Sequence, residues 1–442
     1  MEHKKERRKN LIRYIIPSTL GMLSVFVFTV VDGIFVGQGV GADGVGAVNI
    51  AYPFIMIFMA VEMLASIGGL TVMAIRKGRG DETGMNRAFM HSLTATVLVG
   101  TVFTVLAVVF TVPVSRMMGA NGTFLAMVCD YIFWYGVFML PCALNTELQG
   151  AVRNDGDPVL ASVSTVTATM LNIIGDWLFV FPLQMGLKGA AIATGISQVV
   201  SLLICLSHFV RKKGVLRIEG FVPDRSLYRL IAVRGLPECV AQFNAPLVCI
   251  MYNYVLLAKL GDTAENAYAV ICYVASFAIA VSIGVSEGLQ PLFGNAYGEK
   301  NEEDLLWYRR AGLVISVAGA AVIYAALLFA GEPVCSLYGV GGDVMDLIRV
   351  YMPRYSVGFS VQAVNMIISA YLYSTTRTRE ALILNVLRSF VVDTLVIFLM
   401  PALFGVDSIW YAFAVYEAVM AVIGFAVMVR ADKKGVITRA EE

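Results

Sequence analysis

The first apolar stretch of this chain reads LIRYIIPSTLGMLSVFVFTVVDGIFVG, residues 11–37, and it decides the fold class. It follows a basic start, KKERRK at residues 4–9, and it exceeds the ~20 residues that a helix needs to cross a bilayer. The stretch is too long for the apolar core of a signal peptide, and no small-residue cleavage site ends it. We therefore predict that it forms a first transmembrane helix.

Similar apolar runs continue along the chain of 442 residues, of which 58% are hydrophobic and only 15% are charged. A soluble protein would carry roughly 25% charged residues. The net charge of +1 gives no indication of nucleic-acid binding, and we expect the lipid bilayer to surround the chain. The runs predict an all-α integral membrane protein with twelve transmembrane helices, at residues 11–37, 45–75, 88–112, 123–150, 159–182, 189–210, 231–258, 264–294, 311–330, 345–374, 381–403 and 408–430.

The distribution of Lys and Arg predicts the orientation of these helices. Basic residues concentrate in both terminal segments, in the connection around residues 211–234, and in every second connection between helices. The connections on the other side carry only Arg116, Lys188 and Lys259. We therefore expect both termini to be cytoplasmic, in a multi-pass protein of the cell (inner) membrane.

The two halves of the chain repeat each other at an offset of about 220 residues. Two fused, similar bundles are the usual architecture of transporters with alternating access. We predict two pseudo-symmetric bundles: an N-terminal six-helix lobe at 1–210, a cytoplasmic linker at 211–230 and a C-terminal six-helix lobe at 231–442. The corresponding residues include Pro17 and Pro237, Gly41 and Gly261, Gly68 and Gly288, Gly78 and Gly298, and Asn145 and Asn365.

Motifs for nucleotide binding and covalent catalysis are absent or misplaced. No GxxxxGK[ST] phosphate-binding loop occurs, so the chain does not hydrolyse ATP itself. The GxGxxG match at 39–44 lies in a predicted turn with no strand before it, and the GxSxG match at 284–288 lies inside an apolar helix. A helical turn and close helix packing explain both matches. We predict that the chain is not an enzyme and carries no cofactor.

A layer of polar side chains in the first predicted bundle is the strongest candidate site. Asp32 lies ~7 Å from the outer end of its span at 1.5 Å per residue, and Asp176 lies at a similar depth. Asn172 is one helical turn from Asp176, and Thr194 lies at a matching level of the sixth span. If they face each other, these groups form an oxygen-rich pocket for a proton or a sodium ion, with Asp32 and Asp176 as charged ligands. The alternative is a hydrogen-bonded network that only holds the bundle together.

Acidic residues outnumber bases inside the predicted spans, where each ionisable side chain costs ~2.5–3.5 kcal/mol at mid-bilayer on insertion scales. A central cavity should therefore be electronegative and should favour cationic ligands. The Met side chains near Glu62 would form a pliable surface that suits varied ligands, and plain helix packing is the alternative role for them. The candidate residues of a substrate cleft are Glu62, Asn145, Glu287, Met59 and Met63.

The second half is less regular. Glu287 and Arg388 both lie in the inner part of the membrane and are candidates for a mostly structural ion pair. Asp393 and Glu417 each lie near mid-membrane on the last two predicted spans. The sequence does not decide their roles.

Five motifs spread over the chain carry a family resemblance. They read VDGIFVG at 31–37, LQGAVRNDGDP at 148–158, LNIIGD at 171–176, GAAIAT at 189–194 and GLQPLFG at 288–294. With these motifs the chain resembles the MATE (multidrug and toxic compound extrusion) transporters. The resemblance implies two six-helix lobes around a central cleft, and export of amphipathic organic cations in exchange for protons or sodium ions.

The resemblance also implies roles for single residues. In the branch with an ion site in the N-terminal lobe, the residues that carry it match Asp32, Asn172, Asp176 and Thr194. The proline that lets the first span bend when this site changes state matches Pro17. The other branch uses acids in spans 7 and 10, and span 10 of this chain has no internal acid, so that branch fits less well.

Two other functions stay open from the sequence. A flippase for lipid-linked sugars would share this layout, since a related superfamily does, although pyrophosphate lipids would favour more arginines in the cleft. A receptor or an intramembrane enzyme would need a soluble sensor domain or a nucleophile and base. We expect small organic cations as ligands, H+ or Na+ as the coupling ion, and a monomer.

Overall fold

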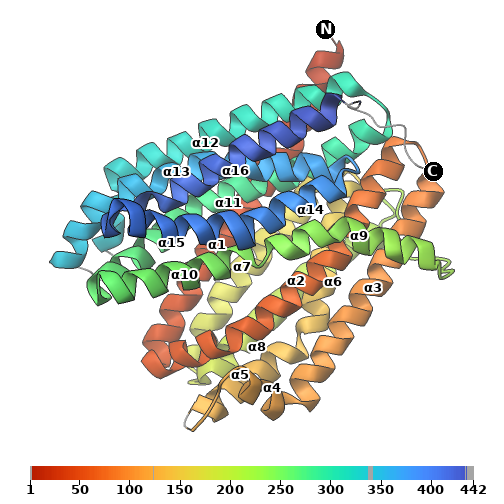
Figure 1. Ribbon diagram of the computed structural model, residues 1–442. Helices are drawn as coiled ribbons and strands as arrows, with labels where there is room; N and C mark the ends of the chain where they lie inside the picture. Colours follow the sequence, from red (N-terminus) through yellow and green to blue (C-terminus); the bar gives the residue numbers. More distant parts are fainter. Residues whose placement is uncertain (1, 123, 337–341, 434, 436–442) are drawn as a thin grey trace. The chain divides into compact units, whose positions relative to one another are not determined.

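The computed structural model describes residues 2–122, 124–336, 342–433 and 435, and within these ranges it is helical without strands. The predicted all-α fold is confirmed (Figure 1). The helices are α1 (Glu2–Gly39), α2 (Ala42–Gly78), α3 (Glu82–Val109), α4 (Thr111–Met117), α5 (Phe124–Val137), α6 (Met139–Asn154), α7 (Pro158–Val180), α8 (Gly186–Val210), α9 (Arg225–Ala241), α10 (Asn244–Lys259), α11 (Asp262–Gly298), α12 (Glu302–Ser336), α13 (Asp343–Ser374), α14 (Thr378–Val386), η1 (Leu387–Val392), α15 (Asp393–Phe404), η2 (Val406–Ser408) and α16 (Ile409–Lys433).

Membrane-length apolar helices dominate the described part of the chain. Ten helical segments are long and apolar enough to cross a membrane, and the bent pair α5 and α6 raises the number to eleven. Helix α13 covers the predicted span 345–374 with 32 residues but is not among them. The number is therefore close to the twelve that the sequence predicts.

Three predicted spans contain an irregularity in the helix. The run at 123–150 bends by 46° between α5 and α6. The run at 231–258 divides between α9, which contains Pro237, and α10. The run at 381–403 contains the π-helical segment η1, a geometry that often marks functional positions. Pro246, in the first turn of α10, cannot donate a hydrogen bond to the carbonyl of Gln242, which lowers the cost of the break between α9 and α10.

The chain divides into two compact units, which we call unit 1 and unit 2. Unit 1 comprises residues 1–19 and 240–442, and unit 2 comprises Leu20–Cys239. Each boundary falls three residues beyond a proline of the repeat, Leu20 after Pro17 and Val240 after Pro237. The lobe limits from the sequence, 1–210 and 231–442, stay a prediction. The compact units differ from these lobes in two segments: residues 1–19 belong to the unit that contains the second half, and residues 231–239 belong to the unit that contains the first half.

Unit 2 contains a very close helix crossing. A Cβ atom at Gly68 of α2 would lie 2.0 Å from the carbonyl oxygen of Ile231 in α9. A Cβ atom at Gly235 of α9 would lie 1.9 Å from the carbonyl oxygen of Leu64. Only glycine permits such an approach of two helix backbones. Residues 225–239 are therefore built into unit 2 by direct backbone packing.

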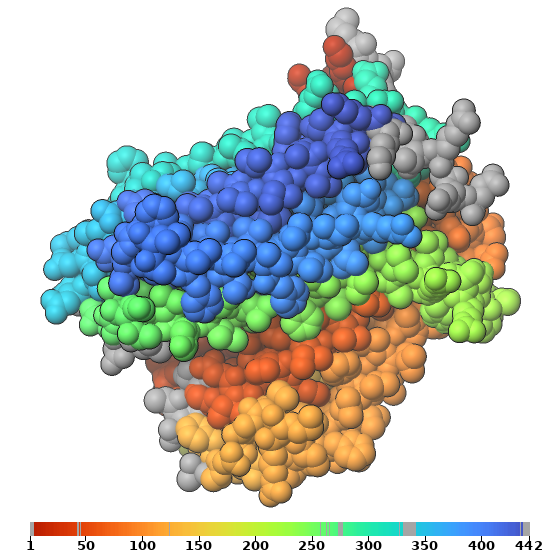
Figure 2. Space-filling model, viewed as in Figure 1, coloured from red at the N-terminus to blue at the C-terminus, as the bar shows by residue number. Residues whose placement is uncertain are grey.

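Unit 1 repeats this arrangement with its own N-terminal segment. A Cβ atom at Gly288 of α11, the repeat counterpart of Gly68, would lie 2.9 Å from the Cα atom of Ile15. The buried Arg7 forms ion pairs with Glu303 and Asp304 at the start of α12. Figure 2 shows α16 of the same unit, in the darkest blue, beside a lighter blue band that contains α14 and α15. The first 19 residues are thus held by unit 1 through both packing and charge.

Candidate ion-coupling site

Three helices of unit 2 bring the predicted ion-site residues together. Asp32 lies on the part of α1 that belongs to unit 2, Asn172 and Asp176 lie one turn apart on α7, and Thr194 lies on α8. Helices α7 and α8 are consecutive and pack along each other (Figure 1). Asp157 caps the N-terminus of α7, because its side chain accepts a hydrogen bond from the backbone amide of Leu160.

Asn172 connects the two helices through its amide. In the orientation that satisfies all its partners, its nitrogen donates to Asp176 Oδ2 at 3.0 Å. Its oxygen accepts from Thr194 Oγ1 at 3.0 Å and from the Thr194 amide at 3.2 Å. Asn172 and Asp176 are buried. The amide therefore fixes one carboxylate oxygen of Asp176 and leaves the other one available.

The carboxyl groups of Asp32 and Asp176 are hydrogen-bonding neighbours. Two carboxyl groups can share a hydrogen bond only when one of them carries a proton. One oxygen of each, Asp32 Oδ1 and Asp176 Oδ1, is buried without a hydrogen-bond partner in the described part of the chain. The arrangement is therefore suited to hold one positive charge, either a proton shared by the pair or a small cation among the oxygens.

Tyr131 of α5 is a neighbour of this site that the sequence reasoning missed. Its ring lies close enough to Asp32 and Asp176 for their charges to act on its hydroxyl group. Tyr131 packs against Tyr135, one turn later, with ring centroids 6.0 Å apart. An aromatic residue in an apolar run gives no sequence signal of such a role, because aromatic residues are common packing residues in membrane helices.

Pro17 lies inside α1, which is continuous through it. Residues before Leu20 belong to unit 1, whereas Asp32 belongs to unit 2. The same helix therefore carries the carboxyl group of a candidate ion site in one unit and a proline at the border of the other.

The candidate residues of the substrate cleft do not form one group within a unit. Met59 is exposed and Met63 is half-buried, both on α2 of unit 2, whereas the half-buried Glu287 belongs to unit 1. Asn145 is buried in unit 2, where it donates to Gln198 Oε1 at 2.5 Å and accepts from Gln149. A common substrate cleft stays a prediction for these residues.

The expected pairing of Glu287 with Arg388 is wrong. Arg388 instead forms an ion pair with Glu417 of α16, whose second oxygen accepts from Asn365 at 2.6 Å. Asp393 accepts from Asn244 at 2.5 Å. The estimated depth in the membrane could not show whether Glu287 or Glu417 pairs with Arg388, because both acids lie in apolar runs. The partner of Arg388 depends on which helix packs beside it.

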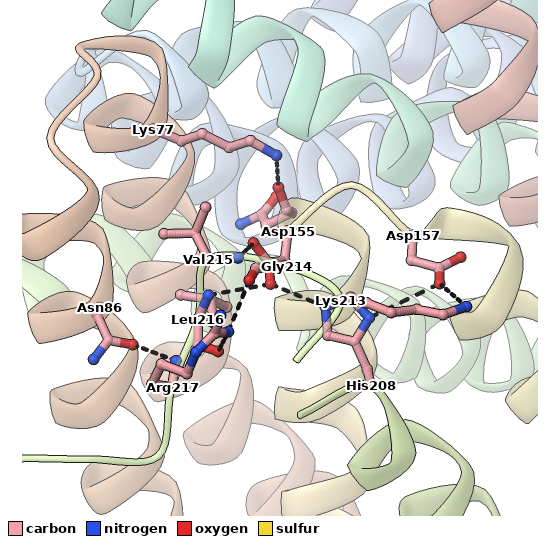
Figure 3. Close-up of polar contacts among 11 residues, drawn as sticks. Lys77, Asn86, Asp155, Asp157, His208, Lys213, Gly214, Val215, Leu216 and Arg217 are labelled. Carbon is pink, nitrogen blue, oxygen red and sulfur yellow. Dashed lines mark hydrogen bonds and ion pairs between the residues drawn. The ribbon is translucent and has the colours of Figure 1, made fainter. Parts of the chain in front are cut away.

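The linker after α8 is fastened to unit 2 by Asp155, which follows α6. Its carboxylate accepts from His208 Nε2 at 2.9 Å, from the amide of Val215 at 2.9 Å and from the amide of Leu216 at 3.2 Å (Figure 3). Burial acts to raise the pKa of Asp155, but these three donors outweigh it, so its pKa is lowered. The sequence predicted a cytoplasmic linker here and gave no sign of this anchor.

Two more contacts hold the linker. The amide of Arg217 donates to Asn86 Oδ1 at 2.7 Å, as Figure 3 shows. The amide of Asp224 donates to His91 Nε2 at 2.9 Å. Helix α9 then begins at Arg225, so the last part of the predicted linker, 211–230, is helical.

Comparisons with known proteins agree with this architecture. The family model MatE matches residues 17–178 and 239–399. The "Multidrug export protein MepA" of Staphylococcus haemolyticus (strain JCSC1435) is 22% identical over 426 residues, covering 95% of this chain and 93% of that protein.

Two solved structures have a similar fold. The "Crystal structure of MATE in the straight conformation" has a TM-score of 0.91 at 23% identity, and covers 97% of this chain and 96% of that one. The "Crystal structure of MATE in the bent conformation" has a TM-score of 0.87 at 24% identity, and covers 98% and 97%.

The helices, the repeat and the buried acids define a multi-pass membrane transporter and not an enzyme. The family match covers both halves of the chain. This chain belongs to the MatE family, that of the MATE transporters.

Proposed function

We propose that this protein is an antiporter that exports amphipathic organic cations by alternating access, in exchange for H+ or Na+. The relative named "Multidrug export protein MepA" supports drug export as the class of transport. The observation that carries the ion coupling is the cluster of Asp32, Asn172, Asp176 and Thr194 within unit 2. We place the protein in the cell membrane with both termini in the cytoplasm, because most Lys and Arg residues lie on that side.

The coupling mechanism follows from the shared hydrogen bond of the two carboxyl groups. When the site holds a proton or Na+, one of the two negative charges of Asp32 and Asp176 is neutralised, and α1 can stay packed against α7. When the ion leaves, two buried carboxylates face each other and repel. Relief of this repulsion moves Asp32, and α1 bends at Pro17, where one helical hydrogen bond is already missing.

Two of the similar structures, described as straight and bent conformations of a MATE protein, support a conformational change of this kind. In this chain, α1 passes from one unit to the other just after Pro17. Bending there alters how the two ends of α1 are held. This gives the ion site a physical route to the rest of the molecule.

The test uses the purified full-length protein in proteoliposomes with imposed H+ or Na+ gradients and a fluorescent lipophilic cation. Asp32→Asn and Asp176→Asn keep nearly the same shape but remove the charge, and each should abolish gradient-driven uptake of the dye. Glu82→Gln, which removes an exposed acid from the same unit, is the control and should transport like the wild type. Undiminished coupled transport in Asp32→Asn would refute the proposed site.

A further inference from the structure

A second buried acid pair lies in unit 2, apart from Asp32 and Asp176. Glu62 of α2 is 3% exposed and Glu147 of α6 is 0% exposed. The two carboxyl groups are near enough for the charge of one to act on the other. No Lys, Arg or His forms an ion pair with either of them within the described ranges. Two acids without a base inside membrane helices are costly unless they hold a positive charge.

Hydroxyl groups from two helices surround the Glu147 carboxyl group. Ser66 follows Glu62 by one turn on α2, and Ser92 and Thr96 lie one turn apart on α3. All three hydroxyls are buried neighbours of Glu147. Helices α2, α3 and α6 pack against one another, so these groups converge from three elements.

The hydrogen-bond donors that the protein places beside Glu147 are hydroxyl groups. Both carboxyl oxygens of Glu147, Glu62 Oε1, Ser66 Oγ and Thr96 Oγ1 make no hydrogen bond of normal geometry within the described residues. Ser92 differs, because its hydroxyl donates to the carbonyl of Ala65 at 3.1 Å and therefore presents only lone pairs to the cluster. The cluster therefore offers several buried oxygen lone pairs to a cation.

We propose that Glu62 and Glu147 form a second cation site, which takes up one proton or one Na+ within a cage of carboxyl and hydroxyl oxygens. Proton uptake forms one O–H bond on a carboxylate with a proton from water, and the neighbouring oxygens accept from it. Sodium uptake uses the same lone pairs. The oxygen-only donor set suits a hard cation rather than a transition metal.

Few other titratable groups face this cluster. Cys142, on the same helix as Glu147, lies near Glu62. His91 neighbours Ser92 in the chain, but both its ring nitrogens are engaged, with the carbonyl of Arg87 and the amide of Asp224. The cluster therefore responds to cations mainly through its own two carboxyl groups.

The experiment separates this cluster from the proposed coupling site by removing that site first. In the double variant Asp32→Asn/Asp176→Asn, purified in detergent, we measure binding of radioactive Na+ and the infrared carbonyl band of protonated carboxyl groups as pH changes. A residual signal of either kind should persist. Adding Glu62→Gln and Glu147→Gln should abolish it, whereas adding Glu82→Gln should not.

A second variant guards against misfolding. Thr96→Val keeps the side-chain shape and removes one hydroxyl ligand. It should lower the affinity of the residual site for its cation by about tenfold, measured as Na+ binding or as the titration of the residual carboxyl band. If the Asp double variant binds no Na+ and shows no titrating carboxyl group, or if Glu62→Gln and Glu147→Gln leave its signal unchanged, the second site is refuted. Normal coupled transport by Asp32→Asn would instead refute the proposed function and leave this inference standing.

Discussion

Asp155→Asn should release the linker between α8 and α9. The wild-type carboxylate accepts three hydrogen bonds, from His208 Nε2 and from the amides of Val215 and Leu216. Hydrogen bonds to charged groups contribute ≈1.5–3 kcal/mol each. An asparagine oxygen can retain the donors of one carboxylate oxygen only, and its NH2 group then faces a donor. We expect the free energy that holds the linker in place to fall by about 3 kcal/mol, which raises the equilibrium constant for linker opening about 100-fold.

Hydrogen–deuterium exchange of the purified protein measures this opening directly. Peptides that contain residues 211–224 should exchange about 100-fold faster in Asp155→Asn. Trypsin should also cleave the released linker after Lys212, Lys213 and Arg217 more rapidly. Asp157→Asn is the matched control. Asp157 Oδ2 lies 3.8 Å from His208 Nδ1 and 3.9 Å from Lys213 Nζ, which is beyond hydrogen-bond distance, and asparagine can still cap α7. Equal exchange in wild type and Asp155→Asn would refute the anchor.

The same anchor predicts a pH dependence of defined sign. The folded-state pKa of Asp155 is lowered, so the anchor contributes fully above the ordinary pKa of a free aspartate, ~3.9. Its contribution is lost only as pH falls below that value toward the lowered pKa. Exchange in the linker should therefore stay slow through mild acidification and rise below about pH 4. Release of the linker near neutral pH would contradict the assignment to Asp155.

Three further substitutions test other parts of the structure. Pro17→Ala should slow transport more than it weakens substrate binding, measured as turnover and as dye affinity, because it makes bending of α1 more costly; unchanged turnover would mean that this bend is not used. Gly235→Ala would place a Cβ atom 1.9 Å from a main-chain oxygen of α2 and should destabilise unit 2 by at least about 1–3 kcal/mol in thermal unfolding, whereas Gly33→Ala, with no atom within 4 Å, should not. Arg388→Met leaves the buried Glu417 without its base and should cost about 3–5 kcal/mol, and the added change Glu417→Gln should restore much of that loss.

Apolar length and the repeat predicted the helices well, because membrane helices need long continuous runs that composition reveals directly. The breaks within predicted spans were missed. The bend between α5 and α6 lies just before Pro141, which removes the helical hydrogen bond to the carbonyl of Val137. Proline also occurs inside the continuous helices α1 and α2, so a proline in an apolar run does not by itself predict a break.

Depth along the helices predicted that Asp32, Asn172, Asp176 and Thr194 share one level, and the structure brings Asn172 into contact with Asp176 and Thr194. Their role in ion coupling stays a prediction. Depth could not predict which residues face each other across helices. It therefore missed Tyr131 and assigned Arg388 the wrong partner.

The exchange of the segments before Leu20 and Val240 has a consequence for the synthesis of the chain. Residues 1–19 are translated before the whole of unit 2, yet the unit that holds them contains no other residue before Val240. Unit 2 is likewise incomplete until residues 225–239, the part of α9 that packs against α2, have been translated. The nascent first half therefore cannot complete its packing by itself, and α1 must wait in the membrane for helices that are translated some 220 residues later. Fragments cut within 211–224 should fold only when both are produced together in one membrane.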